Sequence, residues 1–497
     1  MDIGTTTISA VMIDAQSGEV LKSCTKPNRS GLCSERGMDE LQDPQQICGI
    51  IDGILEEMLM APEPIVSIGI TGQMHGILYL NADGDAVSPL YTWRDECGNQ
   101  PYRDGKSYAE NLSCTTGYAA ASGFGCTTHY YHFINRKIPA EAVCFCSIQD
   151  YAALHLTGRH APLVHSSNAA SFGLFDFHTM CFDHNAFQQA GMDPSILPSV
   201  TSACEIVGYY KGKIPVSVGV GDNQASFLGS VRDWKNSVLL NMGTGSQITF
   251  AAEHYAQLPG LECRPCMENL FLQAGSSLCG GRSFALLEDF FRKCAELVTG
   301  QPVASAYPGI DRCIAEMLAD QAEAPWISSL AVSTKFCGTR SDPYERGSIM
   351  NIGTDNFTPQ NMIVGFIYGA VSELYDMYRV WSGTHSLLIG SGNGLRSNRL
   401  MQRIAEEIFG MRLYIPAHME EAAFGAALVG LVSAGCCKNF CEGGSGKTSG
   451  CLRAYQVGGG GVAYLRPVTF RTGGVAEGIV YCIISFYFQI YFFICPG

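Results

Sequence analysis

The sequence predicts an α/β fold in two domains followed by a tail. Its 497 residues exceed the length of one average domain. Hydrophobic residues make up 46% and charged residues 16% of the chain, which is enough apolar material for large buried cores. Segments of strand type alternate with segments of helical spacing, and several strands end in glycine-rich turns. Such turns at strand ends are where open α/β sheets hold ligands.

The first of these turns stands at the start of the chain. Asp2 and Ile3 are followed by Gly4, Thr5 and Thr6, and then by an alternating strand pattern. Glycine permits close approach of the backbone, and the threonines offer hydroxyl and amide groups to a phosphate. An aspartate beside such a turn commonly helps to hold a hydrated Mg²⁺ ion, so Asp2 is a candidate metal ligand. An ordinary hairpin is the alternative, and the first strand should be short.

A second ligand segment is predicted after a helix and a strand. Apolar spacing predicts a helix over Asp43–Met60, and Ile65–Ile70 has the pattern of a short buried strand. The strand leads into Gln73, Met74 and His75. Because polar side chains at a strand end can bond to sugar hydroxyls, these residues are candidate substrate ligands. A histidine that simply satisfies its own strand end is the alternative.

Two further segments carry candidate substrate ligands. Trp93 could stack on the apolar face of a sugar while Arg94 and Asp95 bond to its hydroxyls. A surface ion pair between Arg94 and Asp95 is the alternative. Asn168 lies at the centre of Ser166–Ser171, a polar stretch that we expect to be a ligand loop.

The strongest signal is the segment around Asp222. The strand pattern Pro215–Val220 ends at a glycine turn, and a helix is expected to begin at Asp222. A carboxylate in this position can point into a cleft and accept a proton, so Asp222 is the candidate general base. The next residue, Asn223, is a candidate substrate ligand.

The second half of the chain repeats the pattern of glycine turns. A strand over Ser237–Met242 leads into a second phosphate turn, and a later strand leads into a glycine-rich segment suited to adenine or ribose. The candidate ATP ligands there are Gly243, Thr244, Gly245, Gly390, Gly392 and Asn393. The later segment lacks the glycine spacing of a dinucleotide site. Two glycine–threonine turns and one carboxylate indicate transfer of a phosphoryl group from ATP, with Mg²⁺.

The net charge and the cysteine content exclude some classes of protein. The net charge of −14 argues against an extended nucleic-acid surface, which would be basic. The 22 cysteines are scattered through a long chain without a signal-peptide pattern. We therefore expect a reduced, cytoplasmic protein rather than a secreted one.

The end of the chain differs in character from the rest. Ile479–Cys495 is a run of seventeen uncharged residues, shorter than the ~20 needed to span a bilayer comfortably. A membrane anchor and a non-native tail both stay open, whereas no membrane contact is expected for the preceding core. We expect one domain over residues 1–232, a second over residues 233–435 and an atypical tail over residues 436–497.

Taken together, these turns resemble the FGGY carbohydrate kinases, members of the actin-like (ribonuclease H-like) ATPase superfold. The resemblance covers residues 1–435 and rests on seven segments that fall in the family's order. They are Asp2–Thr6, Gly72–Gly76, Trp93–Asp95, Gly221–Gln224, Gly243–Ser246, Phe336–Arg340 with Arg346–Ser348, and Gly390–Asn393. The resemblance implies two actin-like domains that flank a catalytic cleft, with the sugar mainly on the first and ATP mainly on the second.

The resemblance also implies a substrate class. Its Gln73-Met74-His75 segment is similar to that of ketose kinases, and the stretch around Asn168 is more similar to sedoheptulokinases than to xylulokinases. We therefore expect phosphorylation of a ketose at its terminal hydroxyl, with sedoheptulose as the first candidate and a pentulose as the alternative. The expected assembly is a monomer or a homodimer. Cys97 stands where the resemblance predicts an arginine. A non-catalytic nucleotide-binding sugar sensor and a damaged family member that folds poorly are the rival interpretations.

Overall fold

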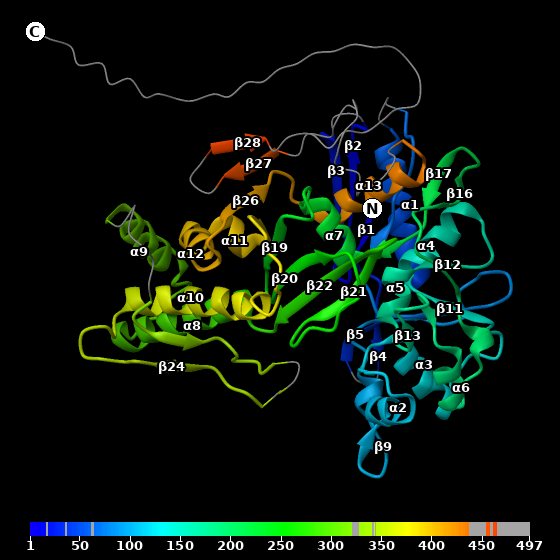
Figure 1. Ribbon diagram of the computed structural model, residues 1–497, viewed down its shortest axis with the longest axis horizontal. Helices are drawn as coiled ribbons and strands as arrows, with labels where there is room; N and C mark the ends of the chain where they lie inside the picture. The colour runs from blue at the N-terminus through cyan, green and yellow to red at the C-terminus, as the bar shows by residue number, and fades with distance from the viewer. Residues whose placement is uncertain are drawn as a thin grey trace, which may run out of the picture.

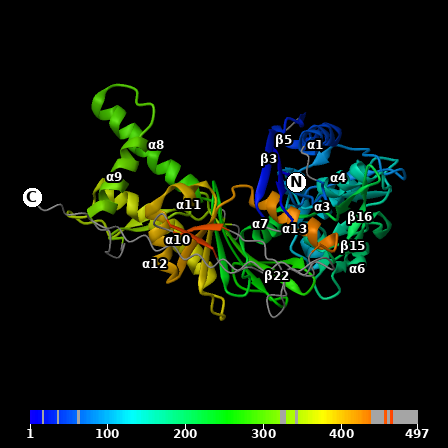
Figure 2. The same ribbon diagram turned by 90° about the horizontal axis from the view of Figure 1, so that it is seen from above.

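The computed structural model describes residues 1–15, 18–34, 37–60, 64–320, 328–339, 342, 344–436, 454–457 and 461–464. These residues form two bodies that lie side by side, each built on one large β-sheet (Figures 1 and 2). The predicted two-body α/β architecture is confirmed. The predicted tail Ile479–Cys495 lies outside the described residues. Among the described helices, none has the length and apolar character that crossing a membrane requires.

The first body contains a five-stranded sheet with the strand order β18-β6-β1-β2-β3. Its strands are β1 Asp2–Ile3, β2 Thr7–Ile13, β3 Val20–Pro27, β6 Thr71–Gly72 and β18 Val220–Gly221. β1 pairs with β2 in the antiparallel sense and with β6 in the parallel sense, and β18 adds a further parallel strand. The ends of β1, β6 and β18 therefore meet at one edge, where Gly4, Gln73 and Asp222 follow them.

The second body contains an eight-stranded sheet with the order β21-β22-β20-β19-β25-β26-β27-β28. Its strands are β19 Ser237–Met242, β20 Ser246–Ala252, β21 Glu262–Met267, β22 Leu270–Ser277, β25 Leu387–Ser391, β26 Arg412–Pro416, β27 Ala454–Val457 and β28 Gly461–Tyr464. β19 pairs with β20 in the antiparallel sense and with β25 in the parallel sense. This repeats the pairing of β1 with β2 and β6, so each sheet centres on a strand that ends in a glycine–threonine turn.

Short strand pairs extend both bodies. They are β4 Gly31–Ser34 with β5 Gly37–Gln42 and β8 Leu90–Tyr91, β7 Leu78–Leu80 with β11 Cys144–Cys146, β9 Pro101–Arg103 with β10 Lys106–Ser107, β12 Leu163–His165 with β15 Ser199–Thr201, β13 Phe175–Asp176 with β14 Cys181–Phe182, β16 Ile206–Tyr210 with β17 Ile214–Ser217, and β23 Ala331–Ser333 with β24 Ser348–Met350.

Helices cover the two sheets. They are α1 Pro44–Leu59, α2 Tyr108–Thr116, α3 Gly125–Ile134, α4 Ile148–Thr157, α5 Ser166–Ser171, α6 His184–Gln189, α7 Asp222–Ser230, α8 Gly280–Thr299, α9 Tyr307–Asp320, α10 Pro359–Tyr378, α11 Asn393–Ser397, α12 Arg399–Phe409 and α13 Glu421–Ser433. The helix predicted over Asp43–Met60 is confirmed as α1: Asp43 caps it through bonds to two backbone N–H groups, and its apolar positions are buried.

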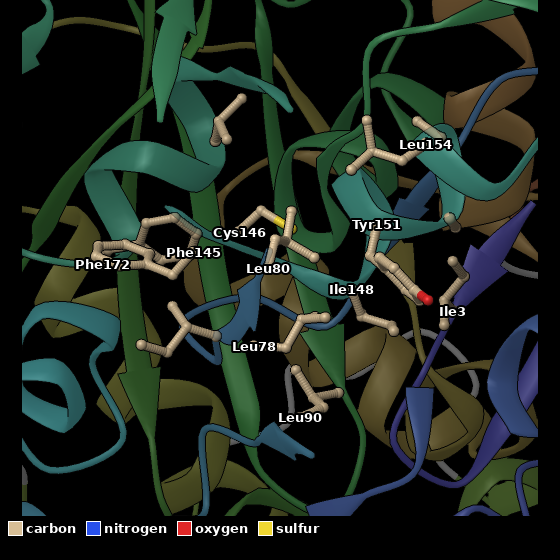
Figure 3. Close-up of a cluster of buried hydrophobic side chains, with 14 of the residues drawn as sticks. Ile3, Leu78, Leu80, Leu90, Phe145, Cys146, Ile148, Tyr151, Leu154 and Phe172 are labelled. Carbon is tan, nitrogen blue, oxygen red and sulfur yellow. The ribbon is translucent and has the colours of Figure 1, made fainter. Parts of the chain in front are cut away.

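Each body has its own hydrophobic core. In the first core, Ile3 of β1 belongs to the same buried cluster as Ile148 and Tyr151 of α4 (Figure 3). Leu78 and Leu80 of β7 belong to this cluster as well. These side chains are almost inaccessible to solvent. Their burial holds β1, and so the first phosphate turn, against α4.

Helix α13 returns the chain from the second body to the first. The chain passes from the first body to the second between α7 and β19, crosses back between β26 and α13, and returns after α13 to the second sheet as β27. Residues Phe424, Leu428 and Leu431 of α13 pack with Val11 and Ile13 of β2. Figure 1 accordingly draws α13, in orange, over the blue strands of the first sheet.

An arginine ties down the returning segment. Arg396 of α11 donates from Nη1 to the carbonyl oxygen of Pro416 at 2.6 Å and from Nη2 to that of His418 at 2.7 Å. Its guanidinium also pairs with the Glu421 carboxylate at the start of α13. The segment between β26 and α13 is therefore held to the second body by Arg396, and α13, which follows it, is held to the first sheet by its packing on β2.

Two local predictions were wrong. The strand predicted over Ile65–Ile70 is reduced to a bridge between Ile68 and Val216, followed by β6. Ladder hydrogen bonds need a partner strand, and β1 supplies only two residues on that side. The polar stretch Ser166–Ser171 is helix α5 rather than a loop, because the His165 side chain accepts a hydrogen bond from the Ser167 backbone and caps it.

Candidate active site

Asp222 lies at the contact between the two bodies, at the first position of α7. The next two side chains of that turn reach the second sheet. Asn223 donates to Gln247 of β20, and Gln224 donates to the carbonyl oxygen of Pro265 in β21 at 2.8 Å. The first turn of α7 therefore holds Asp222 directly between the two sheets.

The Asp222 carboxyl group has an altered acidity. Burial raises its pKa from 3.8 to about 6, although the Arg264 guanidinium acts in the opposite direction. Arg264, in β21, also pairs with Glu262 at 2.6 Å. A carboxyl group whose pKa lies near neutrality is well matched to general-base work.

Asp2 is the second carboxyl group of the site. Burial and, to a smaller extent, the charge of Asp222 raise its pKa to about 7, against the opposing effect of the Met1 ammonium group. Its Oδ1 atom is buried and has no hydrogen-bond partner among the described residues. Two carboxyl groups whose charges interact, one with an unsatisfied oxygen, form an environment that a cation would stabilise.

These residues fit a magnesium ion. Mg²⁺ is usually bound by one or two carboxylates together with waters and substrate phosphates. Asp2 supplies such a carboxylate, and its orphaned buried Oδ1 is an available oxygen ligand. No group of three or more His, Cys, Asp or Glu side chains that could hold a metal ion occurs among the described residues.

The first phosphate turn is joined directly to the predicted substrate ligands. The Thr5 hydroxyl donates to Oε1 of Gln73 at 3.1 Å and accepts from Nε1 of Trp93 at 3.0 Å. The backbone oxygen of Gly4 accepts from Asn28, and that of Thr6 accepts from the backbone of the same residue. One threonine hydroxyl therefore connects the turn to both segments.

The segment after β6 packs against α5 and α7. His75 has a positive φ of 73°, its ring nitrogen Nδ1 lies 2.8 Å from the carbonyl oxygen of Ser171, and its ring stacks on Phe124 at 4.8 Å. Met74 is buried and lies against Gly221, next to Asp222. The structure thus places Gln73, Met74 and His75 in one layer with the candidate base.

Asn168 and Asp95 are held by the protein itself. The Asn168 amide donates to the carbonyl oxygen of Gly219 at 3.0 Å and accepts from Gln149 at 2.7 Å, and the side chain is fully buried. Asp95 is buried and caps a short 3₁₀ helix through the backbone N–H of Cys97. Trp93 contrasts with them because 46% of its surface is exposed.

The second phosphate turn is fastened to the start of α8. The backbone N–H of Gly281 donates to the carbonyl oxygen of Gly243 at 2.8 Å, and that of Arg282 donates to Thr244 at 3.1 Å. A Cβ atom at Gly281 would lie 2.4 Å from the Gly243 oxygen, so only glycine allows this approach. Gly245 closes the turn by accepting from the Gly243 backbone at 3.0 Å.

A cavity of about 1060 Å³ joins this turn to the predicted adenosine segment. Gly243, Thr244, Gly392 and Asn393 line it, together with Arg282. Gly245, in the turn between β19 and β20, and Gly390, inside β25, are not among the residues that line the cavity. Two segments about 150 positions apart in the chain therefore meet on one concave surface, as a nucleotide site requires.

Sequence reasoning missed three residues that shape this site. Arg264 faces Asp222, Arg282 lines the cavity, and Gln42 bonds to both Gln73 and the Thr5 backbone. A lone arginine in a strand or at a helix start carries no distinguishing spacing. The positions of β21 and α8 reveal the two arginines, and the hydrogen bonds from Gln42 at the end of β5 to the Thr5 backbone and from Gln73 to Gln42 reveal the third residue.

Comparison with known proteins agrees with this arrangement. Residues 1–229 match the N-terminal domain of the FGGY family of carbohydrate kinases. The chain is 24% identical over 475 residues to a sedoheptulokinase from Mus musculus, which covers 86% of this chain and 96% of the mouse protein. It is 22% identical over 478 residues to a glycerol kinase from Photorhabdus laumondii, which covers 89% of this chain and 90% of that protein.

The solved structures show the same fold. A ligand-bound xylulose kinase from Lactobacillus acidophilus superposes with a TM-score of 0.73 at 19% identity, covering 88% of this chain and 90% of that one. This fold is the actin-like ATPase fold predicted above. From the family match and the shared fold, we conclude that residues 1–229 form an N-terminal domain of the FGGY family of carbohydrate kinases, and that the chain as a whole has the fold of the solved sugar kinases.

Proposed function

We propose that this carbohydrate kinase transfers the γ-phosphoryl group of ATP to the terminal hydroxyl of a ketose, with sedoheptulose as its substrate. The observation that carries the proposal is Asp222, a carboxyl group with a pKa of about 6 held between the two sheets. Similarity to sedoheptulokinases over most of the chain supports the choice of sugar.

In the proposed reaction, the Asp222 carboxylate accepts the proton of the sugar hydroxyl as that oxygen attacks the γ-phosphorus, and ADP leaves. A positioned base of this kind accelerates a reaction by about 10²–10⁴-fold. The backbone N–H groups of the turns at Thr5 and Thr244 stabilise charge on the transferring group. Mg²⁺, when bound at Asp2, would neutralise phosphate charge.

The proposal assigns the other residues by their environment. Met74, His75, Trp93 and Asn223 contact the sugar. Gln73, Asn168 and Asp95 hold these residues in position, because their own polar atoms already bond to the protein. The remaining nucleotide ligands are those at the glycine turns: Gly4, Thr5, Thr6, Gly243, Thr244, Gly245, Gly390, Gly392 and Asn393.

The division of labour follows the two sheets. We assign the sugar to residues 1–232 and the nucleotide to residues 233–435, with α13 returning to the first sheet. We place the enzyme in the cytoplasm, where ATP and Mg²⁺ are supplied. The enzyme would act there as a monomer or homodimer.

The direct test is ADP release from ATP and Mg²⁺ with sedoheptulose, xylulose, glycerol and gluconate. Turnover with sedoheptulose and little with the others supports the proposal. Preference for xylulose keeps the reaction and overturns the choice of sugar. ATP binding without turnover on any sugar favours the sensor interpretation.

The activity should fall on the acidic side of about pH 6. The base must be deprotonated, and burial raises the pKa of Asp222 to about 6, so kcat/KM should drop by about tenfold per pH unit below that value. Arg264→Gln should move this limb to higher pH, because the guanidinium lowers the pKa of Asp222. A profile that stays flat down to the ordinary value of 3.8 would contradict the assignment.

The Thr5 hydroxyl should matter for sugar affinity. In Thr5→Val, the hydrogen bonds to Gln73 and Trp93 are lost while the shape is kept. A net loss of about 1–2 kcal/mol should raise the KM for sugar about tenfold. Thr7→Val is the matched control, since that side chain is exposed at the start of β2. Equal KM values in the two variants would show that the linkage plays no part.

A further inference from the structure

Two cysteines that are distant in sequence meet beside the nucleotide cavity. The Sγ atoms of Cys279 and Cys337 lie 3.7 Å apart, within hydrogen-bonding distance for sulfur. Cys279 is buried at the N-cap of α8. Cys337 is partly exposed in the segment between β23 and β24. The contact therefore joins two elements that no strand pairing holds together.

The two thiols differ in character. The Arg282 guanidinium lies 3.5 Å from Sγ of Cys337 and lowers the pKa of that thiol, and the charge of Arg346 acts in the same direction. Burial raises the pKa of Cys279 to about 11, and the charge of Glu373 adds to this effect. An accessible sulfur that favours the thiolate next to a protonated, buried one is the arrangement of an attacking and a resolving thiol.

The pair is connected to the nucleotide cavity by the backbone of α8. Cys279 stands two positions before Gly281, whose N–H group bonds to the Gly243 carbonyl of the second phosphate turn. Arg282 contacts the Cys337 sulfur and also lines the cavity. A covalent bond between these sulfurs would therefore displace the first turn of α8, whose backbone N–H groups bond to the second phosphate turn.

We propose that Cys279 and Cys337 form a peroxide-oxidisable dithiol site whose disulfide weakens nucleotide binding. The Cys337 thiolate attacks a peroxide oxygen, the O–O bond breaks, and a sulfenic acid and hydroxide form. The Cys279 sulfur then attacks the Cys337 sulfur, the S–S bond forms, and water leaves. In total the two thiols lose two electrons and two protons, and hydrogen peroxide becomes two waters.

The geometry permits this step. The sulfur atoms must approach from 3.7 Å to about 2.05 Å, the length of a disulfide bond. Cys337 lies in a turn-rich segment whose backbone bonds are local, such as that from Gly338 to the Lys335 carbonyl at 3.1 Å. The disulfide would take the sulfur acceptor away from Arg282 and tie this segment to the start of α8.

The test uses the full chain treated with hydrogen peroxide. Peptide mass spectrometry without reduction should find Cys279 linked to Cys337, with the loss of two hydrogens. The dissociation constant for ATP with Mg²⁺ should rise about tenfold, and dithiothreitol should reverse both changes. In Cys337→Ser and Cys279→Ser, peroxide should produce neither the linkage nor the loss of affinity relative to the untreated variant.

The matched control is Cys114→Ser. Cys114 is exposed and lies 3.2 Å from Nζ of Lys106, so it is a second thiol next to a cation. This variant should respond to peroxide as the parent chain does. An unlinked, reduced Cys337 in the treated parent, or an equal loss of affinity in Cys337→Ser, would overturn the proposal.

Only the affinity measurement rests on the proposed nucleotide site. If the linkage forms in a chain that never binds ATP, the dithiol site stands, but its effect on binding and the proposed function are overturned. If ATP binds equally well before and after linkage, the proposed function stands and the effect of the dithiol on binding is overturned.

Discussion

Replacing Asp222 by asparagine should lower kcat about 10²–10⁴-fold, the contribution of a positioned general base. Binding of ATP and sugar should change little, because asparagine keeps the shape and polarity of the side chain. The fold should be unharmed or slightly stabilised, since burial already disfavours the charged form of Asp222 and raises its pKa to about 6. Kinetics and calorimetric titration on the same preparation separate these effects.

Asp83→Asn is the control for this experiment. Asp83 is exposed in the turn before β8, so its carboxylate lies on the surface of the first body. It should keep the parent kcat and melting temperature. Substantial turnover in Asp222→Asn would assign the base to another group, and a collapse of its melting temperature would show a structural role instead.

Gly425→Ala should destabilise the enzyme severely. Helices α13 and α7 cross so closely that a Cβ at Gly425 would lie 1.8 Å from the carbonyl oxygen of Ala225, and one at Gly229 would lie 1.9 Å from that of Glu421. Because both obstacles are helix backbone, the helices must move apart. We expect a cost of about 3 kcal/mol, the upper part of the range for overpacking, and a loss of activity, since α7 begins with Asp222.

The matched control is Gly49→Ala, a helical glycine in α1 whose added Cβ would meet nothing within 4 Å. It should be stabilising by up to about 1 kcal/mol, because alanine has the higher helix propensity. Thermal unfolding of both variants beside the parent chain checks the pair. Similar melting temperatures would mean that α13 and α7 can separate without cost.

The glycine turns could be predicted from sequence because their signal is local. Gly243 follows an apolar strand, and the end of that strand was identified at the correct residue. The long helix α1 was likewise predicted from apolar spacing. In each case a short window of the chain determines the structure.

The features that could not be predicted from the sequence depend on contacts between segments that are distant in the chain. Nothing near Arg264 indicates that β21 brings it to Asp222. Asn168 looks like a ligand in a polar stretch, yet Gln149 and Gly219 satisfy its amide from other elements. The return of α13 to the first sheet could not be predicted either, because its small residues only describe a helix that packs closely.

Two of the places where the chain passes between the bodies have a mechanical consequence. A body attached at one point can swivel in every direction, whereas a body attached at two points turns about the line that joins them. The segment after α7 and the one before α13 are two such attachments, and Arg396 clamps the second. We therefore expect any opening and closing of the two bodies to be a door-like swing about these two attachments, which would bring the same two edges face to face each time.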